Sequence, residues 1–126
     1  MTRQKIITDT APAPGGAYSQ AIVAGEFVFL SGQGPFLPGS GEKVEGSFSD
    51  HARQTLRNLA AVAEAAGGGL DDAVRVGVFL RDMDDFPTMN EIFGEFFNEP
   101  LPARTTIQSN LPGFTIEIDA ILYLGG

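Results

Sequence analysis

Two charged residues near the end of the chain are the best candidates for chemistry. Arg104 follows Pro102-Ala103 at the start of an expected strand, and Glu117 lies between two isoleucines in the next expected strand. Arginine stays protonated and its planar guanidinium matches a carboxylate, so Arg104 could bind a small acidic substrate while Glu117 handles a proton or a water molecule. The alternative interpretation is a structural ion pair on a solvated face of the sheet.

The strands that carry these two residues are expected over residues 103–109 and 114–124. Side chains alternate between the two faces of a strand, so Thr106 shares a face with Arg104. If the two strands form a hairpin, Arg104 lies about opposite Glu117. If the strand expected over residues 74–80 lies between them, the two residues only share a face. The residues alone leave both arrangements open.

The face of the last strand that carries Glu117 is chemically mixed. In alternation, one face of this strand is apolar, and the other presents Glu117, Asp119, Ile121 and Tyr123. A face that combines carboxylates with large apolar side chains is not purely a solvent-facing one. It could therefore meet a partner subunit.

The rest of the chain shows the periodicity of four strands and two helices. The first helix is expected to be capped by Ser49 or Asp50 and to end at Gly67-Gly68-Gly69. The second helix is expected to have Asp85 as its N-cap and to bury Phe86, Met89, Phe93, Phe96 and Phe97. The further strands are expected over residues 5–8, 18–23, 27–31 and 74–80.

Composition excludes several classes of function. A chain of 126 residues, 43% of them apolar, fits one domain over residues 1–126. Sixteen acidic residues against eight basic ones give a net charge of −8, which repels phosphate backbones and makes nucleic acid an unlikely partner. No stretch approaches membrane-spanning length, so no membrane contact and a cytoplasmic location are expected.

Metal and thiol chemistry are also not expected. The chain has no cysteine and a single histidine, His51, which we expect to be exposed in the first turn of a helix. A Ser-His-Asp triad would depend on this one histidine, and its neighbour Asp50 would point elsewhere on the helix. We therefore predict no metal site and no nucleophilic triad.

Short motifs along almost the whole chain match, in the same order, those of a known family. They are Tyr18-Ser19-Gln20, Leu30-Ser31-Gly32-Gln33, Gln54-Thr55-Leu56-Arg57-Asn58-Leu59, Asp85-Phe86 with Asn90, Phe96-Phe97, Pro102-Ala103-Arg104 and Ile116-Glu117-Ile118. With them the chain resembles the Rid/YjgF family of reactive intermediate imine deaminases, also called the L-PSP endoribonuclease family. No single motif is decisive, but the ordered set is specific.

This resemblance implies a fold, an assembly and an activity. The fold would be α+β and chorismate-mutase-like, with a mixed six-stranded sheet and two helices packed on one face. The assembly would be a homotrimer with its sites in clefts between subunits. The activity would be hydrolysis of 2-imino and 2-enamino acids, such as 2-aminoacrylate or 2-iminobutanoate, to 2-keto acids and ammonia, with no cofactor.

The resemblance also implies roles for residues at matching positions. Arg104 would bind the substrate carboxylate, Glu117 would position or activate water, and the backbone of Gly32 would help to hold the acid group. The cleft would be lined by Tyr18, Ser31 and Asn90. For these last three residues, packing or hydrogen bonding within the fold is the alternative interpretation.

Two positions depart from the family pattern. Thr106 stands where the deaminases often have cysteine, and Phe93 stands where the family often has tyrosine. Thr106 keeps a backbone carbonyl that could hold the water, but its side chain leaves the substrate range and the subgroup open. Two other functions remain: an L-PSP-type endoribonuclease, which the acidic charge disfavours, and a non-catalytic trimer that binds small carboxylates as a sensor. A simple binder needs only the cation, so the presence of both Arg104 and Glu117 favours catalysis.

Overall fold

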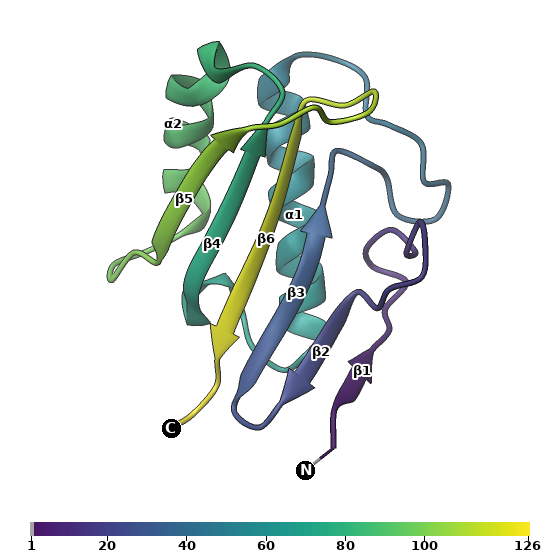
Figure 1. Cartoon of the computed structure of the whole chain (residues 1–126), viewed down its shortest axis with the longest axis vertical. Coiled ribbons are helices and arrows are strands. Elements are labelled where there is room, and N and C mark those ends of the chain that lie inside the picture. The colour runs from purple at the N-terminus through teal and green to yellow at the C-terminus, as the bar shows by residue number, and fades with distance from the viewer. Residues whose placement is uncertain (1) are drawn as a thin grey trace.

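The computed structural model describes residues 2–126, which form one six-stranded sheet and two α-helices (Figure 1). The strands are β1 (Gln4–Ile6), β2 (Ala21–Ala24), β3 (Phe27–Gln33), β4 (Ala73–Leu80), β5 (Ala103–Gln108) and β6 (Ile116–Tyr123). They lie side by side in the order β1-β2-β3-β6-β4-β5. β4 and β5 are parallel, and the other neighbouring pairs are antiparallel. β4 therefore separates the two strands that carry Arg104 and Glu117.

Both helices, α1 (Phe48–Ala65) and α2 (Phe86–Phe96), cover the same face of the sheet (Figure 1). An amphipathic helix is held to a sheet mainly by burial of its apolar stripe. In α1 this stripe includes Ala52, Leu56, Leu59 and Ala63, all at most 1% exposed. The sheet opposes it with the buried residues Val28, Val76, Val78, Leu80, Ile116, Ile118 and Leu122. The expected α+β fold, with a mixed six-stranded sheet and two helices on one face, is confirmed.

The beginning of α1 differs from the expectation. Ser47, rather than Ser49 or Asp50, is the N-cap, and it forms a capping box with Asp50. Ser47 Oγ accepts a hydrogen bond from the Asp50 backbone N–H, and the Asp50 carboxylate accepts one from the Ser47 N–H at 3.0 Å. Such reciprocal bonds satisfy N–H groups that the first helical turn leaves without partners. Asp50 thus stabilises the start of α1 from the third position of the helix, and is not itself the N-cap.

His51 is buried, so the expectation that it is exposed is wrong. It lies one turn before Thr55 on the face of α1 that meets the sheet, and only 8% of it is exposed. Its Nδ1 lies 2.9 Å from Oγ1 of Thr115, just before β6. His51 therefore ties α1 to the start of the strand that carries Glu117.

The strand boundaries differ by a few residues from those expected. β1 ends at Ile6 rather than Thr8, and β2 begins at Ala21, which leaves Tyr18 in the preceding loop. In β4 the register with β6 shifts between Ala73 and Arg75, so Val74 lies at a bulge and is 45% exposed. A bulge interrupts the alternation of faces, which is why Val74 does not share the buried face with the later valines.

The second face of the sheet is not covered by a helix within residues 2–126 (Figure 1). It presents large apolar side chains that are 40–48% exposed, namely Phe27, Phe29, Ile107 and Tyr123. The rings of Phe27 and Tyr123 lie 5.2 Å apart. Glu117 and Asp119 lie on this same face of β6. The expected mixture of carboxylates and apolar groups is thus present, and we call this surface the open face.

Candidate active site

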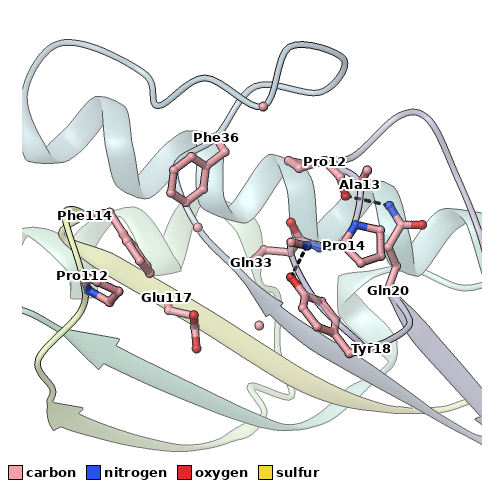
Figure 2. A pocket seen from close by; sticks show the side chains of 14 residues that line it. Pro12, Ala13, Pro14, Tyr18, Gln20, Gln33, Phe36, Pro112, Phe114 and Glu117 are labelled. Carbon is pink, nitrogen blue, oxygen red and sulfur yellow. Dashed lines mark hydrogen bonds between the residues drawn. The ribbon is translucent and has the colours of Figure 1, made fainter.

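Glu117 borders a cavity of about 510 Å³. Three parts of the chain enclose it: the irregular segment before β2, the end of β3 with the loop that follows, and the turn before β6 (Figure 2). Figure 2 shows the carboxylate between Phe114 and Pro112 on one side and Tyr18 on the other. The lining residues are Pro12, Ala13, Pro14, Gly15, Tyr18, Gln20, Gly32, Gln33, Gly34, Phe36, Gly41, Pro112, Phe114 and Glu117. Of these described residues, Glu117 alone carries a charge.

Gly32 is placed against Glu117 by an irregularity in β3. Leu30 pairs with Ala120 and Gln33 pairs with Ile118, so β3 contains one residue more than β6 over this stretch. Such bulges re-aim the backbone and are common beside active sites. A Cβ atom added at Gly32 would lie 2.8 Å from both Cδ and Oε2 of Glu117. Glycine at this position therefore lets the carboxylate lie directly against the backbone.

The environment of Glu117 favours its protonated form. The side chain is half-buried, and its partial removal from water raises the pKa of Glu117 above the ordinary value. The carboxylate of Asp119, two residues along the same face, raises this pKa further. A carboxyl group whose pKa is shifted toward neutrality is better suited to accept and return a proton.

Tyr18 forms the opposite rim of the cavity. Its side chain is 52% exposed, and its hydroxyl oxygen accepts a hydrogen bond from the Gly15 N–H at 2.9 Å. Beneath it, the buried Gln20 uses both ends of its amide within the fold. Oε1 accepts from the Thr8 N–H, and Nε2 donates to the carbonyls of Thr8 and Pro12. Gln20 thus shapes the cavity, while Tyr18 remains open to a ligand.

Ser31 does not line the cavity of the described chain. Its Oγ donates to the Ser19 carbonyl at 2.6 Å, and its backbone N–H donates to the Gln20 carbonyl at 3.0 Å. Both bonds attach the segment before β2 to β3. Within one chain, Ser31 has the structural role that was the alternative to lining the cleft.

Arg104 lies in a different environment, under α2 at the edge of the sheet. Its guanidinium carbon is 4.7 Å from the centre of the Phe93 ring and 5.6 Å from that of Phe86. Its Nη2 donates to Oδ1 of Asn90 at 2.9 Å. Partial removal from water lowers the pKa of Arg104, although an arginine so placed stays charged at neutral pH. Cation–π contacts and one hydrogen bond to a side-chain amide hold the guanidinium in place without neutralising its charge.

The structure does not bring Arg104 and Glu117 together in one chain. Arg104 is opposite Val76, whose side chain is buried under the helices, whereas Glu117 is opposite Phe79 on the open face. Residues paired across neighbouring strands point to the same side of a sheet, so these two point to opposite sides. The hairpin arrangement is therefore wrong; the alternative, with the strand of residues 74–80 between the two, is confirmed, but the two residues do not share a face as that alternative implied. The alternation of side chains along each strand was predicted correctly, but the sequence did not reveal the register between neighbouring strands.

Thr106 lies one alternation beyond Arg104, on the same side of β5. It is opposite Val78, and its Oγ1 is buried with no hydrogen-bond partner within residues 2–126. The side chain therefore contributes no bond to the cavity that contains Glu117. Asn90, which the resemblance places in the cleft, is exposed, and its Oδ1 accepts a hydrogen bond from Nη2 of Arg104.

Three residues that define the cavity were not expected from the sequence: Phe36, Pro112 and Phe114. Phe36 and Pro112 lie in loops where periodicity carries no information, and Phe114, which was expected to begin the last strand, lies two residues before β6. A fourth, Asn58, lies on the buried stripe of α1 and donates to the carbonyls of Gly34 and Phe36 at 3.1 and 2.7 Å. An amide on the buried face of α1, which also carries His51 and Thr55, was the available signal for such an anchor.

Within residues 2–126, no group of three or more His, Cys, Asp or Glu side chains is arranged to hold a metal ion. Nor does any helix there have the length and apolar character needed to span a membrane.

Three features define the class of this protein: the six-stranded sheet with two helices on one face, the cavity that contains Glu117, and the separate site of Arg104. Comparison with known proteins identifies this class. Residues 8–124 match the family model described as Endoribonuclease L-PSP. The chain belongs to this family, the Rid/YjgF or L-PSP family that its motifs resemble.

Individual relatives cover nearly the full length of the chain. A RutC family protein of Pyrococcus horikoshii is 49% identical, over 96% of this chain and 98% of that protein. A 2-iminobutanoate/2-iminopropanoate deaminase of Dermatophagoides farinae is 41% identical, over 98% of this chain and 99% of that protein. The crystal structure of RidA from the Antarctic bacterium Psychrobacter sp. PAMC 21119 superposes with a TM-score of 0.91 at 45% identity, over 95% and 98% of the two chains.

Proposed function

We propose that this protein hydrolyses 2-imino acids, and their 2-enamino tautomers, to 2-keto acids and ammonia at a site completed by a second copy of the chain. The observation that carries the proposal is Glu117, a half-buried carboxylate with a raised pKa that borders a cavity of about 510 Å³. The deaminase name of a relative 41% identical to this chain supports the choice of reaction.

The second copy is needed because the cavity has no cation of its own. A carboxylate substrate would enter beside Glu117, and burying two like charges together without compensation is costly. The lining residues of the described chain include no lysine or arginine, and Arg104 lies on the other side of the sheet. Arg104 of the partner subunit would supply the missing charge if the exposed apolar groups of the open face were buried between copies, as in a homotrimer.

The reaction needs three things from such a site. The guanidinium of a partner subunit would anchor the substrate carboxylate, and C2 of the imine would then face one water molecule near Glu117. Glu117 would accept a proton as that water attacks C2 of the protonated imine, and would return it to the amino nitrogen of the resulting carbinolamine. As the C–N bond breaks, the carbinolamine hydroxyl gives its proton to Glu117 and its oxygen becomes the keto group, and the keto acid and ammonia leave. Gly32 allows the backbone to approach this reacting centre closely.

The direct test generates 2-imino acids in place with an amino-acid oxidase and traps them with semicarbazide. The protein is expected to lower the yield of semicarbazone, and Arg104→Ala and Glu117→Gln are expected to abolish this effect. An unchanged yield across several imines would overturn the proposal. Thermal stabilisation by a 2-keto acid without turnover would then favour the carboxylate-binding alternative.

A mixing experiment tests whether the site is shared between subunits. Arg104→Ala and Glu117→Gln chains are unfolded together in equal amounts and refolded. If each site takes its glutamate from one subunit and its arginine from the next, random assembly restores about a quarter of wild-type sites. Each variant refolded alone is the control. Recovery no greater than that of the separately refolded variants would place both residues in a site within one chain, or outside any common site.

A further inference from the structure

In the single chain, the cavity beside Glu117 has more room than a small 2-imino acid fills, and most of the side chains that line it are apolar. Its volume of about 510 Å³ falls within the range of roughly 300–1,000 Å³ that is typical of pockets for drug-sized ligands. On one side of the carboxylate, Figure 2 shows Phe36, Pro112 and Phe114. We call these three residues the apolar wall.

The apolar wall is built as a unit. The rings of Phe36 and Phe114 meet edge to face, with centroids 5.3 Å apart and an interplanar angle of 67°. Aromatic pairs prefer this geometry. Gly34 makes room for both rings, because a Cβ atom there would lie 2.7 Å from Phe36 Cε2 and 3.4 Å from Phe114 Cε2. The wall therefore depends on a glycine that no turn geometry requires.

Hydrogen bonds hold the two loops that carry the wall. Asn58 is 1% exposed, and its Nδ2 donates to the carbonyls of Gly34 and Phe36. Lys43 pairs with Phe36 in an isolated β-bridge, and its Nζ donates to the Gly113 carbonyl at 2.9 Å. Lys43 thus joins the loop of Phe36 to the loop of Phe114. A surface fixed in this way before ligand binding does not have to be ordered by the ligand.

The chemistry of the wall determines which end of a substrate can face it. Phe36, Phe114 and Pro112 offer no side-chain donor, so a substrate carboxylate or imine nitrogen placed against them would lose hydration without compensation. An apolar substituent at C2 would gain free energy there, because its surface would be removed from water. With the reacting carbon near Glu117, the side chain of the substrate is the part that reaches the wall.

We infer that the apolar wall is the side-chain subsite of the enzyme, and that the preferred substrates are 2-imino acids with large apolar side chains, such as those derived from leucine, methionine or phenylalanine. This inference rests on the proposed function and deepens it. Phe36 and Phe114 are the specificity-determining residues, and Asn58 is a positioning residue that acts through Phe36.

The test compares kcat/KM for imines generated from alanine, leucine and phenylalanine. The wild type is expected to favour the leucine and phenylalanine imines over the alanine imine by roughly tenfold or more. Phe36→Ala and Phe114→Ala are expected to lower kcat/KM about tenfold for the large imines and less than about threefold for the alanine imine. Leu37→Ala is the matched control, because Leu37 lies on the same loop, is 40% exposed and does not line the cavity.

Further variants separate binding from folding. Phe36→Leu and Phe114→Leu keep an apolar side chain of intermediate size, and are expected to lose mainly the phenylalanine imine; thermal unfolding and light scattering check that the assembly is intact. Equal losses for all imines, or a wild-type preference for the alanine imine, would overturn the inference while leaving the deaminase proposal in place. Absence of activity on every imine would remove both.

Discussion

The two charged regions of this molecule are built in opposite ways. Glu117 lies against bare backbone at Gly32, in a cavity with room for a ligand, and has no cation within that cavity in the described chain. Arg104 lies between aromatic rings and an amide, well held but lining none of that cavity. One region has space and a proton acceptor, and the other has charge and orientation. Each lacks what the other supplies, which is the arrangement expected of a site divided between subunits.

Glu117 and Arg104 are also held in position by different physical means. At Glu117, position depends on close approach of atoms, so the region should be sensitive to the addition of a single methyl group. At Arg104, position depends on the planar shape of the guanidinium over Phe93 and its bond to Asn90. That region should be sensitive to the shape of the cation rather than to the charge alone.

Replacing the proton acceptor should have the largest effect. Glu117→Gln keeps the size of the side chain and removes its ability to accept a proton, so kcat for imine hydrolysis should fall about 10²- to 10⁴-fold. Asp119→Asn is the matched control on the same face of β6, and its kcat should remain within about tenfold of wild type. Steady-state rates on one imine measure both. Equal losses in the two variants would show that Glu117 acts through general electrostatics rather than as the base.

Changing the shape of the cation should have the next largest effect. Arg104→Lys keeps the positive charge but loses the planar pair of donors and the stacking on Phe93, so KM should rise roughly 10- to 100-fold while kcat falls less. Asn90→Ala, which removes only the positioning bond, should raise KM by less than tenfold. An unchanged KM in Arg104→Lys would indicate that the charge alone matters and would remove the contrast between the two regions.

Adding one methyl group at Gly32 tests the close approach at Glu117. The Cβ atom of Gly32→Ala would meet the carboxylate at 2.8 Å, so Glu117 must shift, and kcat should fall about tenfold. Gly15→Ala is the matched control, because Gly15 lines the same cavity and its Cβ would lie at an ordinary contact distance of 3.8 Å from the hydroxyl oxygen of Tyr18. A wild-type rate in Gly32→Ala would show that the carboxylate has freedom that the structure does not indicate.

These results also define what the sequence could and could not predict. Periodicity placed both helices, and alternation correctly assigned Glu117 and Thr106 to one or the other face of their own strands. Alternation is a relative property, however, and it cannot say whether Arg104 and Glu117 point to the same side of a sheet. That depends on the register of β4 with both neighbours, which long-range packing sets.

The cavity was less predictable than the charged residues. Phe36 comes from a loop that has no period, and Phe114 lies just outside the strand in which it was expected. The positions of both depend on hydrogen bonds from Asn58 and Lys43 to backbone carbonyls. The bulge that places Gly32 against Glu117 could not be predicted either, because the alternation of apolar and polar residues does not reveal it. Arg104 and Glu117 could be selected by chemical type, but the surface that would distinguish one substrate from another required the folded chain.

The raised pKa of Glu117 predicts how stability depends on pH. The folded protein holds this proton more tightly than the unfolded chain does, so ionised Glu117 lowers the free energy of unfolding at neutral pH. Glu117→Gln should therefore have a higher Tm than wild type at about pH 7. The difference should disappear as pH falls through the raised pKa and below the ordinary value of 4.5. Thermal unfolding across this range measures it, and a variant less stable at neutral pH would contradict the burial of the carboxylate.

The smallest effect is expected at Thr106, on the Arg104 side of the comparison. Its Oγ1 is buried without a partner in the described chain, and an unsatisfied hydroxyl costs free energy that an isosteric methyl group avoids. Thr106→Val should therefore leave Tm unchanged or higher, and kcat/KM within about twofold of wild type, because the backbone carbonyl is retained. Thr106→Ser, which keeps the hydroxyl and removes a methyl group, is the control. A large loss of activity in Thr106→Val alone would show that the hydroxyl gains a partner in the assembled site, and would bring Thr106 into the substrate-binding set together with Arg104.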